Sequence, residues 1–151
     1  MLKRDRRLRP LKEMVGKREN HFATRLAESE RRLSEAEQRQ QELLRYRLEY
    51  EQRFHARATA GAPMRGLREQ QVFIARLGEA MRAQELVLEQ LRAECASARL
   101  QWRAAATRKQ AVGKVVDRAQ AEEQVSENRR QQAENDERAQ HVRPQHVRVS
   151  R

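Results

Sequence analysis

The sequence predicts an all-α fold, an antiparallel two-helix coiled-coil hairpin with a frayed C-terminal extension. Three observations predict it: a long heptad repeat after residue 66, a weaker repeat before residue 58, and a short segment with Gly and Pro between them. Of the 151 residues, 36% are charged and 4% aromatic, which is typical of long helices and unusual for a domain with a thick core. The composition therefore argues against an enzyme with an enclosed pocket.

The second helix is expected over about residues 67–119, because seam positions recur there at alternating steps of three and four. These positions are Leu67, Gln70, Ile74, Leu77, Met81, Gln84, Leu88, Leu91, Cys95, Ala98, Trp102, Ala105, Lys109, Val112, Val116 and Ala119. About seven heptads in one register indicate a coiled-coil helix. Beyond Ala119 the same steps reach mostly polar residues. An unpaired, frayed helical extension is therefore expected to about residue 140, followed by a tail over 141–151 that Pro144 breaks.

The first helix is expected over about residues 9–57. Its seam positions are Leu8, Leu11, Val15, Arg18, Phe22, Leu26, Ser29, Leu33, Ala36, Gln40, Leu43, Arg47, Tyr50 and Phe54. One extra four-residue step between Phe22 and Leu26 predicts a local irregularity in the supercoil. Pro10 is compatible with the first turn of a helix, so the regular helix is expected to begin near Arg9.

Residues 58–66 contain Gly61, Pro63 and Gly66 and are expected to form a loop. A short loop between two amphipathic helices makes them antiparallel neighbours, and a symmetric hairpin would pair residues whose numbers sum to about 123. The seam then has a partner within the same chain. The sequence therefore predicts a monomer with a single elongated domain over residues 1–151.

The net charge of +11 comes from two segments that such a hairpin brings together. Residues 1–18 contain eight Lys or Arg and two acids, and residues 99–121 contain six and one. We call the following subset of these cations the basic cluster: Arg6, Arg7, Arg9, Lys12, Arg103, Arg108, Lys109, Lys114 and Arg118. A charge run is often only a solvated face, but charge gathered from two distant segments favours a docking surface for an acidic partner.

Apolar side chains near the loop exceed what one coiled-coil seam can bury. They are Leu43, Leu44, Tyr46, Leu48, Tyr50 and Phe54 before the loop, and Val72, Phe73, Ile74, Leu77 and Met81 after it. The pairing rule matches Tyr50 with Phe73, Tyr46 with Leu77 and Leu43 with Ala80. Tyr46, Tyr50, Phe73 and Leu77 are therefore expected to be exposed on one flank, where aromatic residues often contact a protein partner. A locally thickened core and a contact between copies are the alternatives.

No motif for catalysis, a cofactor or a metal is present. The sequence lacks a phosphate-binding glycine loop, and its four histidines are not at zinc-ligand spacing from one another or from Cys95. Cys95 lies on the seam and is expected to be a buried thiol. Neither a secretory signal nor a membrane span is expected, because apolar runs are short.

Four segments carry a resemblance to a known family: L-L-R-Y-R-L-E-Y over 43–50, Q-Q-V-F-I-A-R-L over 70–77, Trp102 within Q-W-R, and S-E-N-R-R-Q-Q-A-E-N-D-E-R-A over 126–139. Their order, spacing and common length make nearly the whole chain similar to the flagellar export protein FliJ. The resemblance implies a cytoplasmic, non-catalytic stalk of the type III export apparatus, peripheral at the inner face of the membrane at the flagellar base. Its implied partners are the hexameric export ATPase, the cytoplasmic domain of the export gate FlhA, and export chaperones.

The resemblance also implies roles for residues. The basic cluster would contact the ATPase ring. The gate would bind a docking patch made of Arg39, Leu43, Tyr46, Tyr50, Phe73, Leu77, Ala80 and Gln84, of which Arg39 and Gln84 depart from the family pattern. The equivalent stalk of an injectisome remains an alternative. A basic coiled coil that binds nucleic acid is a second alternative, which is disfavoured because the charge here arises from antiparallel pairing and not from continuous basic-region helices feeding a parallel zipper.

Overall fold

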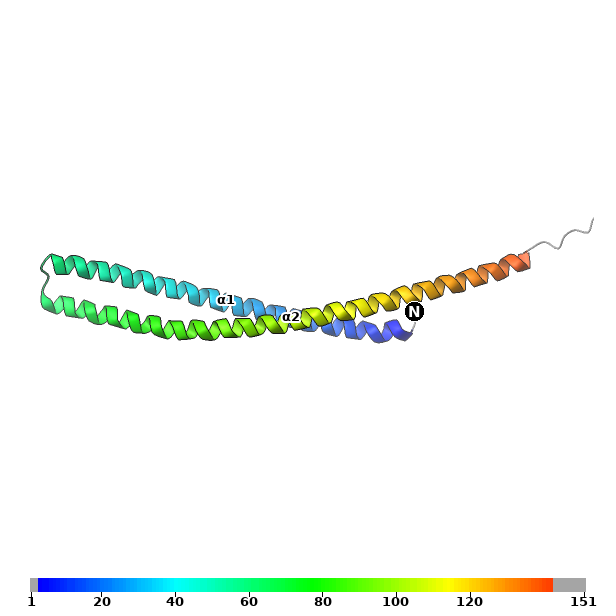
Figure 1. Ribbon diagram of the computed structural model, residues 1–151, viewed down its shortest axis with the longest axis horizontal. Coiled ribbons are helices and arrows are strands. Elements are labelled where there is room, and N and C mark those ends of the chain that lie inside the picture. The colour runs from blue at the N-terminus through cyan, green and yellow to red at the C-terminus, as the bar shows by residue number, and fades with distance from the viewer. Residues whose placement is uncertain (1–2, 143–151) are drawn as a thin grey trace, which may run out of the picture. The chain divides into compact units, whose positions relative to one another are not determined.

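A computed structural model describes residues 3–142, and it confirms the all-α helical hairpin. Helix α1 spans Lys3–Thr59 and helix α2 spans Met64–Val142 (Figure 1). Among residues 3–142, only 60–63 lie outside these helices, and no strand is present. Both helices extend beyond the bounds that the sequence predicts, and the loop is correspondingly shorter. The tail that Pro144 is expected to break lies outside the described residues.

The loop is defined by a C-terminal cap on α1. Gly61 adopts a φ of 79°, the left-handed conformation that a residue with a Cβ rarely adopts. The amide of Gly61 donates to the carbonyl of Ala58 at 3.2 Å, and the amide of Ala62 donates to that of Arg57 at 3.0 Å. This pair of bonds is a Schellman motif, which satisfies two carbonyls at the helix end. Pro63 then directly precedes α2, where its fixed φ favours a helix start.

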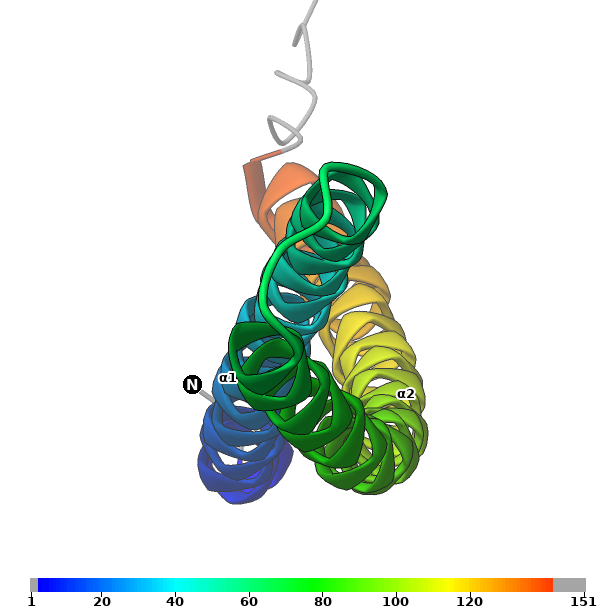
Figure 2. The same cartoon turned by 90° about the vertical axis from the view of Figure 1, so that its left-hand side faces the viewer.

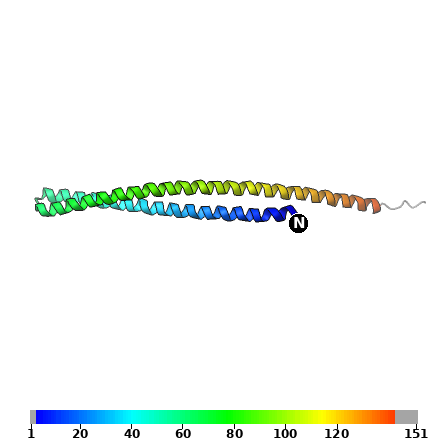
Figure 3. The same cartoon turned by 90° about the horizontal axis from the view of Figure 1, so that it is seen from below.

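The chain divides into two compact units, which are described separately. Unit 2 comprises residues 19–105, so it contains the loop and the arms of α1 and α2 on either side of it. These arms run antiparallel and side by side in Figures 1 and 3, and the view towards the loop in Figure 2 shows that they are inclined to one another. Cross-helix contacts in unit 2 join residues whose numbers sum to between 120, for Ala36 and Gln84, and 129, for Glu30 and Arg99. The predicted pairing rule therefore holds closely.

Unit 2 has a narrow core made mostly of small side chains. Every seam position predicted for α2 within this unit is buried or half-buried, and Leu88 is only 2% exposed. Ala36, Cys95, Ala98 and Ala105 are the other buried core residues of the unit, so Cys95 is the buried thiol that its seam position predicts. Because these residues are small, the two helices can approach closely along this seam.

The predicted irregularity in the first seam is wrong. In unit 2 the covered positions of α1 begin with Glu19 and continue through Phe22, Leu26 and Ser29, while Arg18 is exposed. Steps of four and three therefore alternate without interruption. Glu19 occupies the seam because its carboxylate accepts a hydrogen bond from Nε1 of Trp102, at 3.0 Å, on the opposite helix. A polar side chain in a seam is tolerated when such a partner satisfies it.

Unit 1 comprises residues 1–18 and 106–151, of which 3–18 and 106–142 are described. Val15, Val116 and Ala119 form its buried core, whereas the predicted seam residues Leu11 and Lys109 are exposed. Helix α1 begins before Pro10, which is therefore inside the helix.

Pairing in unit 1 also extends past Ala119, since Arg4 and Glu122 form an ion pair at 3.1 Å. From residue 124 onwards α2 continues as a helix with all described side chains exposed except that of Glu127. Glu123 and Glu127 are half-buried, and every described residue after Glu127 is exposed, so the covered face of α2 ends at Glu127.

A large-to-small substitution in the seam of unit 2 tests this packing. Leu88→Ala should reduce the free energy of unfolding by about 2–5 kcal/mol, because the side chain is 2% exposed and its loss leaves a cavity. Leu48→Ala is the matched control, since Leu48 is 50% exposed and should cost far less. Chemical denaturation of both variants measures the difference, and equal losses would contradict the assignment of the core.

Candidate partner-binding surfaces

The docking patch lies entirely within unit 2, and its side chains divide into two rows. Arg39, Tyr46, Phe73 and Ala80 are exposed, with 53% exposure for Tyr46 and 42% for Phe73. Leu43, Tyr50, Leu77 and Gln84 are half-buried seam residues. The expectation that Tyr50 and Leu77 are exposed is therefore wrong, because both occupy positions that face the opposite helix. The patch is an exposed row supported by a seam row.

An aromatic contact across the two helices orders the centre of the docking patch. The rings of Tyr50 and Phe73 lie 4.5 Å apart between centroids, tilted by 56°, which is the pair that the numbering rule predicts. The guanidinium of Arg53 lies 5.5 Å from the centroid of the Tyr50 ring, within the range of a cation–π interaction. Phe73 is thus held by Tyr50, while nearly half of its surface remains available to a partner.

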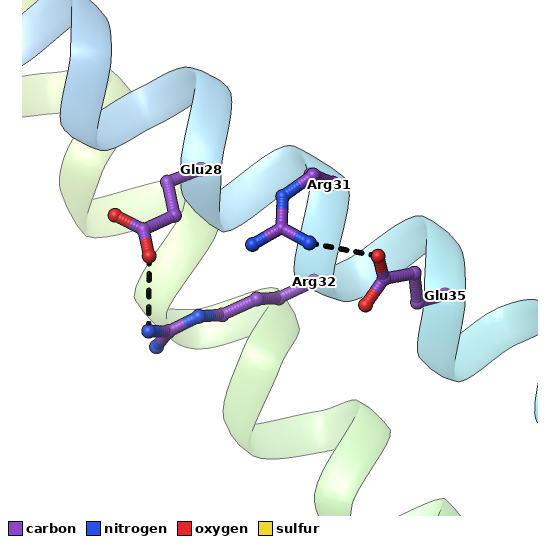
Figure 4. A network of polar contacts seen from close by, with 4 residues as sticks. All are labelled: Glu28, Arg31, Arg32 and Glu35. Atoms are coloured by element: carbon purple, nitrogen blue, oxygen red, sulfur yellow. Dashed lines mark hydrogen bonds and ion pairs between the residues drawn. The ribbon is translucent and has the colours of Figure 1, made fainter.

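Ion pairing along α1 leaves one end of the docking patch positively charged. Arg31 donates to Glu35 at 2.8 Å, and Arg32 donates to Glu28 at 3.1 Å, both one turn apart (Figure 4). Glu35 lies four residues before Arg39 and could have paired with it, but it points to Arg31 instead. Arg39 is therefore left without an ion-pair partner among residues 3–142. Its guanidinium is available to an acidic group.

The structure adds residues to this surface that sequence reasoning missed. A shallow hollow of about 190 Å³ adjoins Arg39 and Gln84, and Arg32, Glu35, Ala36, Val87 and Leu91 complete its lining. A seven-residue spacing in the sequence could have identified Arg32 and Val87. On α1 this spacing joins Arg32, Arg39, Tyr46 and Arg53. On α2 it joins Phe73, Ala80 and Val87. The same repeat would have identified Arg53 beside Tyr50.

The basic cluster lies almost wholly in unit 1. Arg6, Arg7, Arg9, Lys12, Arg108, Lys109, Lys114 and Arg118 are all exposed there, whereas Arg103 is exposed in unit 2. Arg9 of the cluster lies 4.0 Å from Glu13, a long ion pair. Exposed pairs of this kind contribute little to stability. Residues 3–18 and 106–118 thus contain more cations than acids, and the cations of the basic cluster among them are exposed.

Within residues 3–142, the hollow in unit 2 has no serine–histidine pair, and no metal-binding group is present. A hollow of about 490 Å³ between the arms of unit 2 is lined by Arg25, Glu28, Ser29, Arg32, Glu94, Ser97, Ala98 and Gln101. Its serines have no histidine among the lining residues, so neither is placed beside a base that would activate it. Residues 3–142 contain no group of three His, Cys, Asp or Glu side chains placed to hold a metal ion. Within the same residues, neither helix has an apolar stretch long enough to cross a bilayer.

Comparison with models of protein families finds a match. The family model described as "Flagellar FliJ protein" matches residues 4–145, which include both the docking patch and the basic cluster. Neither the comparison with curated proteins nor that with solved structures finds a match.

A double-mutant cycle tests the two-row description of the docking patch. Tyr50→Ala and Phe73→Ala should show a coupling free energy of about 0.5–1.5 kcal/mol, because their rings are in contact. Tyr46→Ala combined with Phe73→Ala is the control, and these effects should add within about 0.5 kcal/mol. Thermal or chemical unfolding of the single and double variants measures both couplings. Equal coupling free energies in the two cycles would contradict the division of the docking patch into an exposed row and a seam row.

Proposed function

The chain belongs to the flagellar FliJ family, and on this basis we propose that it is the non-catalytic stalk of the flagellar type III export apparatus. Membership of the family implies a structural component of flagellar export. In our proposal the basic cluster contacts the hexameric export ATPase, and the docking patch contacts the cytoplasmic domain of the export gate FlhA. Because the matching family is flagellar, it supports this system over an injectisome.

The exposure of Tyr46 and Phe73 carries the gate half of the proposal. Both are large aromatic side chains, 53% and 42% exposed, on helices that are otherwise rich in charge. Aromatic residues of this kind are enriched among the side chains that dominate protein–protein affinity. Arg39, which has no ion-pair partner among the described residues, would add a charge-assisted bond to an acidic group of the gate at the edge of the patch.

The charge of unit 1 supports the ATPase half. Solvated cations on both helices of the unit would be attracted to an acidic surface inside the ring. Such contacts act at long range and accelerate association more than they strengthen the final complex. The two proposed surfaces share no residue, so one partner need not displace the other. Export chaperones are further proposed partners, and the complex would lie at the inner face of the membrane at the flagellar base.

Charge reversal tests the ATPase contact. A variant with Arg7→Glu, Lys114→Glu and Arg118→Glu should bind the ATPase more weakly, and binding of the unmodified protein should weaken as salt rises, because exposed charges are screened within about 10 Å at 0.1 M. The matched control reverses Arg45, Arg57 and Arg65, which are exposed in unit 2. Binding measured at several ionic strengths should separate the two variants. Equal losses, or binding that ignores salt, would refute the electrostatic contact.

Removal of exposed aromatic groups tests the gate contact. Tyr46→Ala and Phe73→Ala should each lower the affinity for the FlhA cytoplasmic domain, by up to roughly 2 kcal/mol if they are hot spots. Leu44→Ala and Leu48→Ala are matched controls, because these side chains are also exposed, at 46% and 50%, and are not part of the patch. Calorimetric titration against the gate domain measures all four. If the leucine variants lose as much affinity as the aromatic ones, the patch is misassigned.

A further inference from the structure

The buried apolar side chains of unit 2 are confined to the half of the hairpin that lies farther from the loop, within residues 19–36 and 88–105. They are Ala36, Leu88, Cys95, Ala98 and Ala105. Residues 37–87, all of which the structure describes, contain no buried apolar side chain. We call residues 37–87 the loop half. Because its apolar seam side chains are at most half-buried, burial stabilises the loop half less than the rest of the unit.

Two glutamines place polar atoms inside the seam of the loop half. Gln40 on α1 and Gln70 on α2 each have a buried Oε1 atom that accepts no hydrogen bond from residues 3–142. The Nε2 atom of Gln40 donates to Glu85 at 3.4 Å, beyond the common range for such bonds. A buried acceptor without a donor is destabilising, because folding removes its bonds to water. Separation of the helices at these positions would return both oxygens to water.

A glycine and an arginine weaken the centre of the loop half. Gly78 is buried at the interface between the helices, where it supplies no side chain. A Cβ at this position would lie 3.8 Å from Nη1 of Arg82 and 4.0 Å from Nη1 of Arg47. Arg47 occupies a seam position of α1, but its ion pair with Glu51, at 3.0 Å, lies within one helix and does not join the two. Glycine inside a helix also disfavours the helical state itself.

We propose that the loop half opens as a local unit and that the gate domain binds its opened form. In this form the arms of the loop half separate and fray, while residues 19–36 and 88–105 stay paired. Separated arms are marginal helices in water, so their backbone hydrogen bonds open with the seam. The opened form exposes Leu43, Tyr50 and Leu77, which are half-buried side chains of the docking patch. Binding segments are commonly drawn from such low-stability parts of a fold.

The gate half of the proposed function is the premise for the binding step. The closed docking patch exposes two large apolar side chains, Tyr46 and Phe73, and opening adds the three of the seam row. A larger apolar centre favours a specific protein–protein interface. A gate domain that contacts both rows selects the opened form, because the seam row faces the opposite helix in the closed form. Its apparent affinity then follows the fraction of chains that are opened, so a tighter seam weakens binding.

Amide hydrogen exchange of the purified chain tests the opening. Once intrinsic rates are allowed for, residues 43–54 and 67–81 should exchange at least tenfold faster than residues 88–105, because the two parts open separately. Gln70→Leu should slow exchange in the loop half about tenfold, since it removes an unsatisfied oxygen and adds apolar contact. Gln71→Leu is the matched control, because Gln71 is the exposed neighbour. Uniform exchange across unit 2, or equal effects of the two variants, would overturn the local opening.

Gly78→Ala measures the loss of helix in the opened form. It should slow exchange in the loop half about two- to fivefold, because alanine favours the helix over the frayed state. The added Cβ would make only ordinary contacts, at 3.8 Å and beyond. Gly113→Ala is the matched control in unit 1, where a Cβ meets nothing within 4 Å, and it should leave the loop half unchanged. If neither or both variants slow exchange in the loop half, its arms do not fray on opening.

Affinity for the FlhA cytoplasmic domain tests whether binding selects the opened form. Gln40→Leu and Gln70→Leu lie outside the docking patch, and each should raise the dissociation constant by the factor by which it slows exchange. The two glutamines are on different helices, so a shared effect reflects closing and not a new contact. Gln41→Leu and Gln71→Leu are the matched controls, because both residues are exposed.

Unchanged or tighter binding by the slowed variants would overturn selection of the opened form. A wild-type chain that does not bind the gate domain would refute the proposed function and the binding step together. Hydrogen exchange decides the opening separately in that case, because it is measured on the chain alone.

Discussion

Burial of one apolar seam between two long helices is the constraint on which the structure depends. Neither helix can cover its own stripe, and a helix with an uncovered stripe is marginal in water. The loop closed by Gly61 supplies the partner from the same chain and sets which residues meet. Once that register is set, Tyr50 must meet Phe73 and Trp102 must meet Glu19. The positions of the docking-patch side chains follow from the register.

The narrowness of that seam explains why so many side chains are available for binding. A two-helix coiled coil buries two positions in seven on each helix, so apolar residues elsewhere remain exposed. Tyr46 and Phe73 are exposed for this reason on one flank, and Val72, Leu86 and Leu100 on the outer side of α2. The cations of the basic cluster are exposed for the same reason. The chain therefore presents several surfaces of different chemistry, which suits a protein whose proposed role is to connect larger components.

Much of the fold could be predicted from spacing alone, because the heptad pattern encodes both the helices and their pairing. The heptad pattern could not identify Glu19 as a seam residue, because Arg18 and Glu19 are both charged. Only the hydrogen bond from Trp102 to Glu19 shows which of the two faces the opposite helix. The excess of apolar residues near the loop predicts that some are exposed, but it does not show which ones face the seam. Tyr50 and Leu77 are wrongly predicted to be exposed for this reason. Arg39 has no ion-pair partner because Glu35 pairs with Arg31 and not with Arg39. The sequence allows either pair, so only the side-chain positions in the structure identify the one that forms. The sequence predicts Pro10 in the first turn, but α1 begins earlier, at Lys3; Leu8 is half-buried there and Arg4 forms an ion pair with Glu122.

In the proposed function, one chain connects two partners through surfaces that share no residue. The most direct measurement is the mass of the species formed when the export ATPase, this chain and the FlhA cytoplasmic domain are mixed, determined by light scattering after size-exclusion chromatography. We expect a ternary complex that requires this chain, with the gate domain retained at saturating ATPase. Displacement of the gate domain by the ATPase would contradict it, because the partners would then compete for one surface.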